Sequence, residues 1–141
     1  MIYTNNTKKA ILIAYNAHMG QYDKMGLPYV LHPIHLAEQM DSEEECIVAL
    51  LHDVVEDTIV TFDDLEKEFS KKIIDALKLL THNKEEDYFE YVKRIKNNEL
   101  AKRVKIEDIK HNSDKTRIEH FTDEDIKRNE KYKKALEILL D

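Results

Sequence analysis

Apolar residues recur along this chain at the spacing of amphipathic α-helices. In the segment 123–140, for example, apolar side chains form one stripe, and lysine and arginine side chains form the opposite, solvated face. No segment alternates apolar and polar residues for long enough to predict a β-strand. We therefore expect an all-α fold of about seven or eight helices. The helices are predicted over residues 7–19, 33–40, 42–57, 61–68, 70–81, 86–96, 98–111 and 123–140.

Three of these helices begin with a capping-box signature, in which a hydroxyl residue is followed three positions later by an acid. Such a pair satisfies backbone N–H groups that have no partner in the first turn of a helix. The pairs are Ser42 with Glu45, Thr61 with Asp64, and Thr122 with Asp125.

The two glycines and two prolines of the chain all lie between Gly20 and Pro33. Glycine and proline interrupt regular structure, so their confinement predicts one long, specialised loop over residues 18–32. Elsewhere the helices can follow one another through short connections.

Residues 49–58 read ALLHDVVEDT and lie in a helix whose apolar positions cover nearly every direction around its axis. Such a helix is buried, and burying His52 and Asp53 is costly unless they are paired or bind a metal. Glu56 follows His52 by four residues, and Asp57 follows Asp53 by four, so each lies one helical turn along. Three carboxylates this close repel one another, and a divalent cation would relieve that repulsion.

Two further residues extend this candidate site. His32 precedes Pro33 at the entry to a helix, where the backbone is rigid. Asp108 lies on the same helical face as Ala101 and Val104, so it points towards the core. With His52 and Asp53 they make a nitrogen and oxygen set without thiolate, which suits Mn²⁺, Fe²⁺, Mg²⁺ or Zn²⁺.

The same residues also fit purely structural roles. His52 and Asp53 fit a core histidine satisfied by an acid, and Glu56 and Asp57 fit solvated acids at the end of a helix. His32 fits an ordinary cap residue. Spacing alone leaves both the metal site and these structural roles open.

Composition narrows the classes of function. A chain of 141 residues with 42% hydrophobic and 36% charged residues fits one domain with a hydrophobic core. Its net charge of -7 argues against a broad nucleic-acid-binding surface. The single Cys46 excludes an internal disulfide, and no signal peptide or membrane segment is recognisable. We expect a cytoplasmic protein that binds neither nucleic acid nor membranes.

Three stretches of the chain resemble longer family motifs. Residues 17–33, AHMGQYDKMGLPYVLHP, resemble A-H-x-G-Q-x-R-K-x-G-x-P-Y-x-x-H-P. Residues 49–58 are similar to A-L-L-H-D-x-V-E-D-T, and residues 104–112, VKIEDIKHN, resemble V-K-L-A-D-R-L-H-N. These motifs are those of the HD-domain metal-dependent phosphohydrolases, in particular the hydrolase domain of the RelA/SpoT-type enzymes and their small stand-alone relatives. The resemblance covers about residues 10–116.

The resemblance implies an HD-domain helical bundle with one divalent ion, usually Mn²⁺. It also implies that a small nucleotide is the partner, since the family removes the 3′-pyrophosphate of guanosine tetra- or pentaphosphate. Glu56 and Asp57 match the catalytic acid pair, Lys24 matches a substrate-binding lysine, and Asn112 matches the asparagine that faces the nucleotide sugar. By position, the implied metal ligands are His32, His52, Asp53 and Asp108.

The chain departs from the family pattern at three positions. Asp23 stands where the family has an arginine, His82 where a lysine is usual, and Ile109 where an arginine follows the metal-ligand aspartate. We therefore expect the cations that capture the substrate to be depleted. Two alternatives follow: an HD phosphatase for another phosphomonoester or nucleotide, and a catalytically weak module that binds metal and nucleotide.

The chain ends soon after the hydrolase-like region, so no synthetase domain is expected. The C-terminal helix over residues 123–140 lies beyond the resemblance and could complete the core or supply a dimer surface. We leave open whether the protein forms a homo-oligomer.

Overall fold

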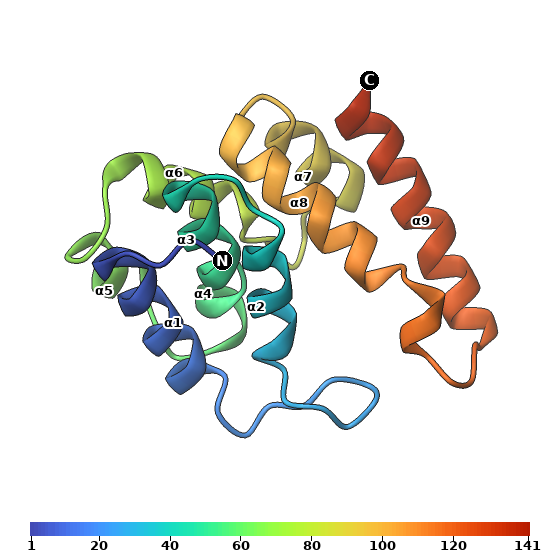
Figure 1. Cartoon of the computed structure of the whole chain (residues 1–141). Helices are drawn as coiled ribbons and strands as arrows, with labels where there is room; N and C mark the ends of the chain where they lie inside the picture. The colour runs from blue at the N-terminus through green and yellow to red at the C-terminus, as the bar shows by residue number, and fades with distance from the viewer.

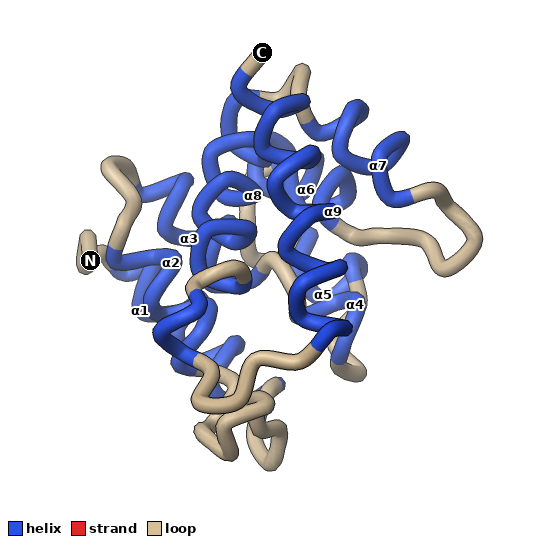
Figure 2. The backbone as a smooth tube through the Cα atoms, turned by 90° about the vertical axis from the view of Figure 1, so that its right-hand side faces the viewer, coloured by secondary structure: helices blue, strands red, loops and turns tan.

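The computed structural model describes residues 1–141, and its regular structure is helical throughout (Figure 1). No strand is present (Figure 2), and one isolated bridge joins Tyr22 to Pro28 within the loop after the first helix. The all-α prediction is therefore confirmed. In chain order the elements are α1 (Asn5–Ala17), α2 (Leu31–Glu38), α3 (Glu43–Leu51), α4 (Val54–Asp57), α5 (Phe62–Glu66), α6 (Lys71–Leu80), α7 (Tyr88–Ile95), α8 (Glu99–Asn112), the 3₁₀ helix η1 (Lys115–Arg117) and α9 (Asp123–Leu140).

Helix α3 forms the centre of the fold. It packs against α1, α2, α6 and α8, and all six of its residues from Cys46 to Leu51 are buried. This agrees with the prediction that a helix apolar on every side lies inside the core. The buried apolar side chains form one cluster of 29 residues, which extends from Ala10 in α1 to Leu139 in α9.

The predicted helix 42–57 is interrupted at His52 and Asp53, so the prediction of one continuous helix was wrong. The chain turns there and resumes as the single turn α4. His52 Nδ1 lies 2.6 Å from the carbonyl oxygen of Ala49, which is the acceptor that the Asp53 N–H group would use in a continuous helix. The His52 side chain therefore competes with the backbone ladder at this turn.

Two of the three predicted capping boxes form both of their hydrogen bonds, and the third forms only one. Both hydrogen bonds of the capping box are present at Thr61 of α5 and at Thr122 of α9. Ser42 accepts a hydrogen bond from the Glu45 N–H group, but the Glu45 carboxylate instead accepts from the N–H group of Asp41. At the end of α8 the short helix η1, which was not predicted, leads into α9.

The loop between α1 and α2 needs its glycines. Gly20 and Gly26 have φ angles of +84° and +80°, in the left-handed region that residues with a Cβ atom rarely adopt. This loop and the segment between α8 and α9 both lie on the lower side of the molecule in Figure 1, and the ion pair between Asp23 and Arg117 joins them.

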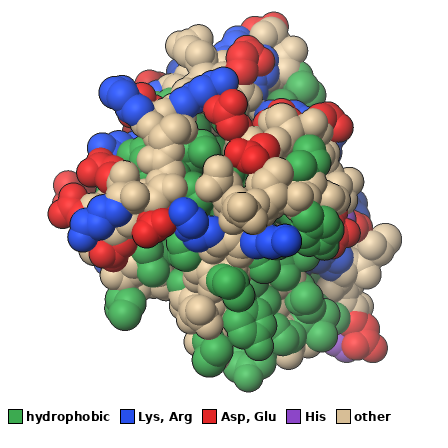
Figure 3. Space-filling view, turned by 60° about the vertical axis from the view of Figure 1, so that its left-hand side comes forward, with side chains coloured by type: hydrophobic (Ala, Val, Ile, Leu, Met, Phe, Trp, Pro, Cys, Tyr) green, Lys and Arg blue, Asp and Glu red, His purple; other side chains and the backbone are tan.

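On one face of the molecule, apolar and charged side chains occupy separate regions. In Figure 3 apolar side chains gather on the lower part of the face, and charged side chains cover the upper part. Large exposed apolar side chains occur on α1 and in the loop after it, among them Leu12, Tyr15, Met19 and Leu27. None of the helices is both long and apolar enough to cross a membrane.

The central position of α3 predicts a large stability cost for shortening one of its side chains. Ile47 is fully buried, so Ile47→Ala should lower the free energy of unfolding by about 2–5 kcal/mol in metal-free urea titrations. Leu12 is 61% exposed, and Leu12→Ala serves as the control, with an expected change within about 0.5 kcal/mol. Equal losses in the two variants would contradict a core centred on α3.

Candidate metal centre and adjoining pockets

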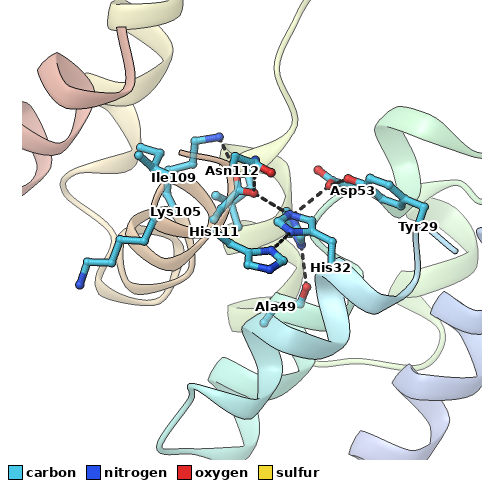
Figure 4. A network of polar contacts seen from close by, with 12 residues as sticks. Tyr29, His32, Ala49, Asp53, Lys105, Ile109, His111 and Asn112 are labelled. Atoms are coloured by element: carbon cyan, nitrogen blue, oxygen red, sulfur yellow. Dashed lines mark hydrogen bonds and ion pairs between the residues drawn. The ribbon is translucent and has the colours of Figure 1, made fainter. Parts of the chain in front are cut away.

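The break after α3 brings His52 and Asp53 to the same place. His52 Nε2 lies 3.0 Å from Asp53 Oδ2. The Asp53 side chain lies beside Tyr29 and near His32 (Figure 4). Because Nδ1 of His52 donates to the Ala49 carbonyl oxygen, the neutral ring presents the lone pair of Nε2 to the interior. The hydroxyl of Tyr29 donates a hydrogen bond to Asp53 Oδ2 and holds that carboxylate from the other side.

His32 reaches the same centre from the first turn of α2. Its Nε2 atom lies 2.8 Å from Asp108 Oδ1, and its Nδ1 atom lies 2.7 Å from Nδ1 of His111. The rings of His32 and His111 are nearly parallel, and the exposed His35 stacks on His111. Burial and the nearby positive charge of Arg117 lower the pKa of His111 to about 4, so His111 is neutral and fixes the ring of His32.

Asp108 points inward from α8, as its position on the apolar face predicts. Its Oδ2 atom accepts from Lys105 at 2.9 Å, and its Oδ1 atom accepts from Asn112 at 3.0 Å. Burial opposes ionisation of Asp108, but Lys105 and the imidazoles of His32 and His52 hold its pKa well below the usual range. Asp108 is therefore a buried carboxylate with one cation beside it.

The donor set fits a divalent metal ion. One ligand atom each from His32, His52 and Asp53 lies within 4.8 Å of the others. His52 Nε2 is buried and makes no hydrogen bond, although two carboxylates face it, with Asp108 Oδ1 at 3.6 Å. Burial lowers the pKa of His52, but Asp53 and Asp108 outweigh that effect and raise it well above its ordinary value. The cluster thus favours a positive charge at this point, and a metal ion supplies one without protonating the ligands.

Glu56 and Asp57 extend from α4 beside this centre. Glu56 Oε1 accepts a hydrogen bond of 2.7 Å from the backbone N–H group of His82, which orients its carboxylate. Desolvation and the charges of Asp53 and Glu56 raise the pKa of Asp57 to about 6. Glu56 and Asp53 line a pocket of about 200 Å³, called here the metal-side pocket. The other residues that line the metal-side pocket are His82, Tyr88, Tyr91, Lys105, Lys131 and Tyr132.

A second pocket, of about 300 Å³ and called here the wide pocket, shares Tyr132 with the metal-side pocket. Lys24 and Asn112, the two predicted substrate-binding residues, both line it. Asn112 also donates to Asp108, so it links the wide pocket to the candidate metal centre. The other lining residues are Tyr22, Asp23, Met25, Tyr29, Asp114, Arg117, Ile118, Arg128 and Tyr132.

The expectation that the cations capturing the substrate are depleted stays a prediction, but cations do line both pockets. Arg117 and Arg128 line the wide pocket, and Lys105 and Lys131 line the metal-side pocket. Apart from Lys105, which follows Val104 in the third motif, they lie after α8 and outside the family motifs, so the sequence carries no signal for them. Asp23 has a structural role instead: its Oδ1 atom accepts from two backbone N–H groups of its own loop, at Met25 and Leu27.

The residues at two further departures from the family pattern make defined contacts within the fold. The side chain of His82 lies beside Tyr91, and its Nε2 atom lies 2.8 Å from the carbonyl oxygen of Glu86. Ile109 is fully buried and belongs to the core cluster.

Tyr29 and His111 have roles that the sequence did not predict. From the sequence, Tyr29 could pack in its loop or border a nucleotide base, and His111 could hydrogen-bond near Asp108. The structure instead gives Tyr29 a hydrogen bond to Asp53 and His111 a hydrogen bond to His32. Both residues therefore support side chains of the candidate metal centre.

The contact between His111 and His32 predicts an effect on metal affinity. His111→Phe keeps a ring of similar shape but loses the hydrogen bond to His32, so the affinity for Mn²⁺ measured by calorimetry should fall about 10- to 100-fold. His35→Phe keeps the stacking position without touching a candidate ligand, and its affinity should match the parent protein. Equal affinities in the two variants would show that His111 does not orient His32.

Comparison with known proteins places this geometry in a family. The chain matches the family model of the HD domain over residues 10–122. It is 40% identical over 74 residues to the bifunctional (p)ppGpp synthase/hydrolase SpoT of Escherichia coli K12, which covers 50% of this chain and 10% of that protein. It is 40% identical over 85 residues to the guanosine-3′,5′-bis(diphosphate) 3′-pyrophosphohydrolase of Borreliella burgdorferi, which covers 54% of this chain and 13% of that protein. The chain thus spans about a tenth of the length of these relatives.

A solved structure resembles the fold over the full chain. It is described as "A metazoan ortholog of SpoT hydrolyzes ppGpp and plays a role in starvation responses", and it matches with a TM-score of 0.77 at 24% identity. The match covers 100% of this chain and 86% of that chain, and at this identity it concerns the fold. The helical core around His32, His52, Asp53 and Asp108 and the family model over most of the chain lead to one conclusion: the chain belongs to the HD domain family.

Proposed function

We propose that this protein is a metal-dependent phosphohydrolase that acts on a nucleotide polyphosphate. The observation that carries the proposal is the convergence of His32, His52 and Asp53, with one ligand atom each within 4.8 Å of the others, beside a pocket containing Glu56. The names of the relatives support guanosine-3′,5′-bis(diphosphate) as substrate and release of its 3′-pyrophosphate as the reaction.

His32, His52, Asp53 and Asp108 are the proposed ligands of one divalent ion, with Mn²⁺ as the candidate. Such an ion, when bound, lowers the pKa of a water molecule and polarises a phosphoryl oxygen. Tyr29 and His111 keep Asp53 and His32 in place through their hydrogen bonds. Lys105 and Asn112 do the same for Asp108.

Glu56 and Asp57 are the proposed acid pair. In the reaction, water adds to phosphorus, the bond from phosphorus to the 3′ oxygen breaks, and pyrophosphate leaves. One proton comes off the attacking water and one is delivered to the 3′ oxygen. A carboxyl group with a pKa of about 6, as Asp57 has, can both accept and donate a proton near neutral pH. Glu56, held by the His82 N–H group, orients the water within the metal-side pocket.

The positive side chains of the two pockets account for binding a polyanion. Lys24 reaches the wide pocket from the α1–α2 loop, and Asn112 faces the same space from the end of α8. Lys131 lies over the ring of Tyr88, 4.2 Å from its centroid, and lines the metal-side pocket together with Asp53 and Glu56. We propose that Lys131 contacts the phosphate group that leaves.

The proposal is tested with the purified chain, Mn²⁺ and guanosine-3′,5′-bis(diphosphate), with pyrophosphate and phosphate detected separately. Pyrophosphate should be the product, Asp53→Ala should lose both metal binding and turnover, and Glu56→Gln should keep the metal but lose about 10²- to 10⁴-fold in kcat. Glu137→Gln, an exposed acid on α9, is the matched control.

Different outcomes would point to the two alternative functions. Release of phosphate only, from other phosphorylated metabolites, would indicate a phosphomonoesterase. Tight nucleotide binding without turnover in Mn²⁺ would indicate a binding module. An unchanged rate in the double variant Glu56→Gln, Asp57→Asn would rule out the acid pair.

The pKa of Asp57 also predicts a pH-dependent effect on stability. The folded-state pKa of about 6 lies above the unfolded value of about 3.9, so the folded state binds more protons between these pH values and loses stability as pH rises through them. In metal-free protein, Asp57→Asn should therefore raise the melting temperature above about pH 6 and change it little near pH 4. The same variant should lose turnover. If both proteins melted alike at pH 8, the cost of burying the Asp57 carboxylate beside Asp53 and Glu56 would be negligible.

A further inference from the structure

The two proposed acids lie on α4, a helix of only four residues, and a single turn is not held in place by its own hydrogen bonds. On one side Gln21 Nε2 donates to the carbonyl oxygen of Asp57 at 2.9 Å. On the other side the backbone N–H group of His82 donates to Glu56 Oε1 at 2.7 Å. The Glu56 carboxylate is therefore fixed by the segment 81–87 between α6 and α7, called here the α6–α7 connection.

The start of the α6–α7 connection is held by side chains of α7. The last carbonyl groups of a helix have no partner within it, and here three in a row accept hydrogen bonds from α7. Arg94 Nη1 donates to the Leu79 oxygen at 2.7 Å, and Arg94 Nη2 donates to the Thr81 oxygen at 3.0 Å. Between them, the Tyr91 hydroxyl donates to the Leu80 oxygen at 2.6 Å. The residue that follows Thr81 is the one whose N–H group holds the acid of α4.

Arg94 also holds the end of the same connection. Its Nε atom donates to Glu86 Oε2 at 2.7 Å and its Nη2 atom donates to Glu86 Oε1 at 2.9 Å, so the pair is bidentate. His82 Nε2 lies 2.8 Å from the Glu86 carbonyl oxygen, a further contact that ties the two ends of the connection together. One guanidinium thus binds two carbonyl groups at the start of the connection and a carboxylate at its end.

These contacts bear on the acid because a connection between helices is ordinarily mobile, and a mobile N–H group would orient a carboxylate poorly. The planar fork of Arg94 meets both oxygens of Glu86 while the same group meets the two carbonyl oxygens. The ammonium of a lysine is a point charge and does not reproduce this pattern. Arg94 lines neither the metal-side pocket nor the wide pocket, so any effect on the reaction is indirect.

We infer that Arg94 is a positioning residue, which sets the direction of the Glu56 carboxylate through the His82 N–H group. The inference rests on the proposed function, because it assigns the support of one acid of the proposed pair. Loss of the guanidinium fork leaves the metal ligands in place but frees the α6–α7 connection, so Glu56 orients the attacking water less well.

The first experiment measures kcat and KM for guanosine-3′,5′-bis(diphosphate) in Mn²⁺ through the release of pyrophosphate. Arg94→Met should lower kcat about 10- to 100-fold, because a misplaced acid costs that much, and should change KM by less than about twofold. Arg94→Lys, which keeps the charge without the fork, should fall between the parent protein and Arg94→Met. The Mn²⁺ affinity of both variants, measured by calorimetry, should equal that of the parent protein.

Arg103→Met is the matched control. Arg103 likewise donates to a carboxylate and to a carbonyl oxygen, but its partners, Glu107 and Gln39, lie on α8 and at the end of α2. Its kcat should stay within about twofold of the parent value. Circular dichroism and melting temperatures check that each variant folds, and Arg94→Lys carries the test if Arg94→Met does not fold. A kcat within about twofold of the parent value in every folded Arg94 variant would overturn the inference.

Combining two substitutions separates positioning from a general effect on the fold. If Arg94 acts through Glu56, adding Arg94→Met to Glu56→Gln should cost less than about twofold in kcat, because the oriented carboxylate is already gone. A loss as large as in the parent protein would show that Arg94 acts on the fold at large, and the inference would be wrong.

A measurement without substrate separates this inference from the proposed function. Hydrogen exchange of the His82 amide, followed by NMR in metal-free protein, reports the bond to Glu56 whether or not a nucleotide is turned over. The amide should be protected in the parent protein and in Arg103→Met, and should exchange about tenfold faster or more in Arg94→Met and in Glu56→Ala. If this pattern holds without turnover, the proposed function fails and the support of Glu56 by Arg94 stands. Equal exchange in the parent protein and Arg94→Met would refute the inference even if the nucleotide is hydrolysed.

Discussion

Two carboxylates, Asp53 and Asp108, face imidazole nitrogens inside the helical core, and the surrounding structure is arranged to tolerate that charge. A buried carboxylate is stable only with cations or hydrogen-bond donors around it. Lys105 and Asn112 donate hydrogen bonds to Asp108, and Tyr29 donates one to Asp53. Even so, the Nε2 atom of His52 is left facing oxygen without a hydrogen bond. The site thus has more negative than positive charge, which is the property expected of a centre that binds a metal cation.

Much of this arrangement could be predicted from the sequence because its causes are local. Apolar residues at helical spacing placed α3 in the core, and the position of Asp108 among Ala101 and Val104 pointed it inward. His32 beside Pro33 fell at the entry to α2. In each case the relevant neighbours lie within a few residues, so periodicity alone indicates the direction of the side chain.

What the sequence did not predict depends on contacts between distant segments or on competition within a turn. The break at His52 arises because a side chain takes a backbone acceptor, and propensity does not reveal that choice. His111 and His32 are 79 residues apart in the chain. Arg117 and Arg128 lie in a segment without a motif, and only the folded chain brings them to the pocket that contains Asp23. A count of cations within the family motifs therefore underestimated the positive charge that lines the two pockets.

Asp125 performs two tasks with its two oxygen atoms. One oxygen completes the capping box that starts α9, and the other contacts Lys24 and Arg128 at the edge of the wide pocket. A replacement at this position has to begin a helix and hold two cations at once, and few side chains can do both. Any change in this edge of the wide pocket through Asp125 is thereby tied to the stability of the last helix. Arg117, which lines the same pocket, is free of that constraint because its side chain takes no part in starting a helix.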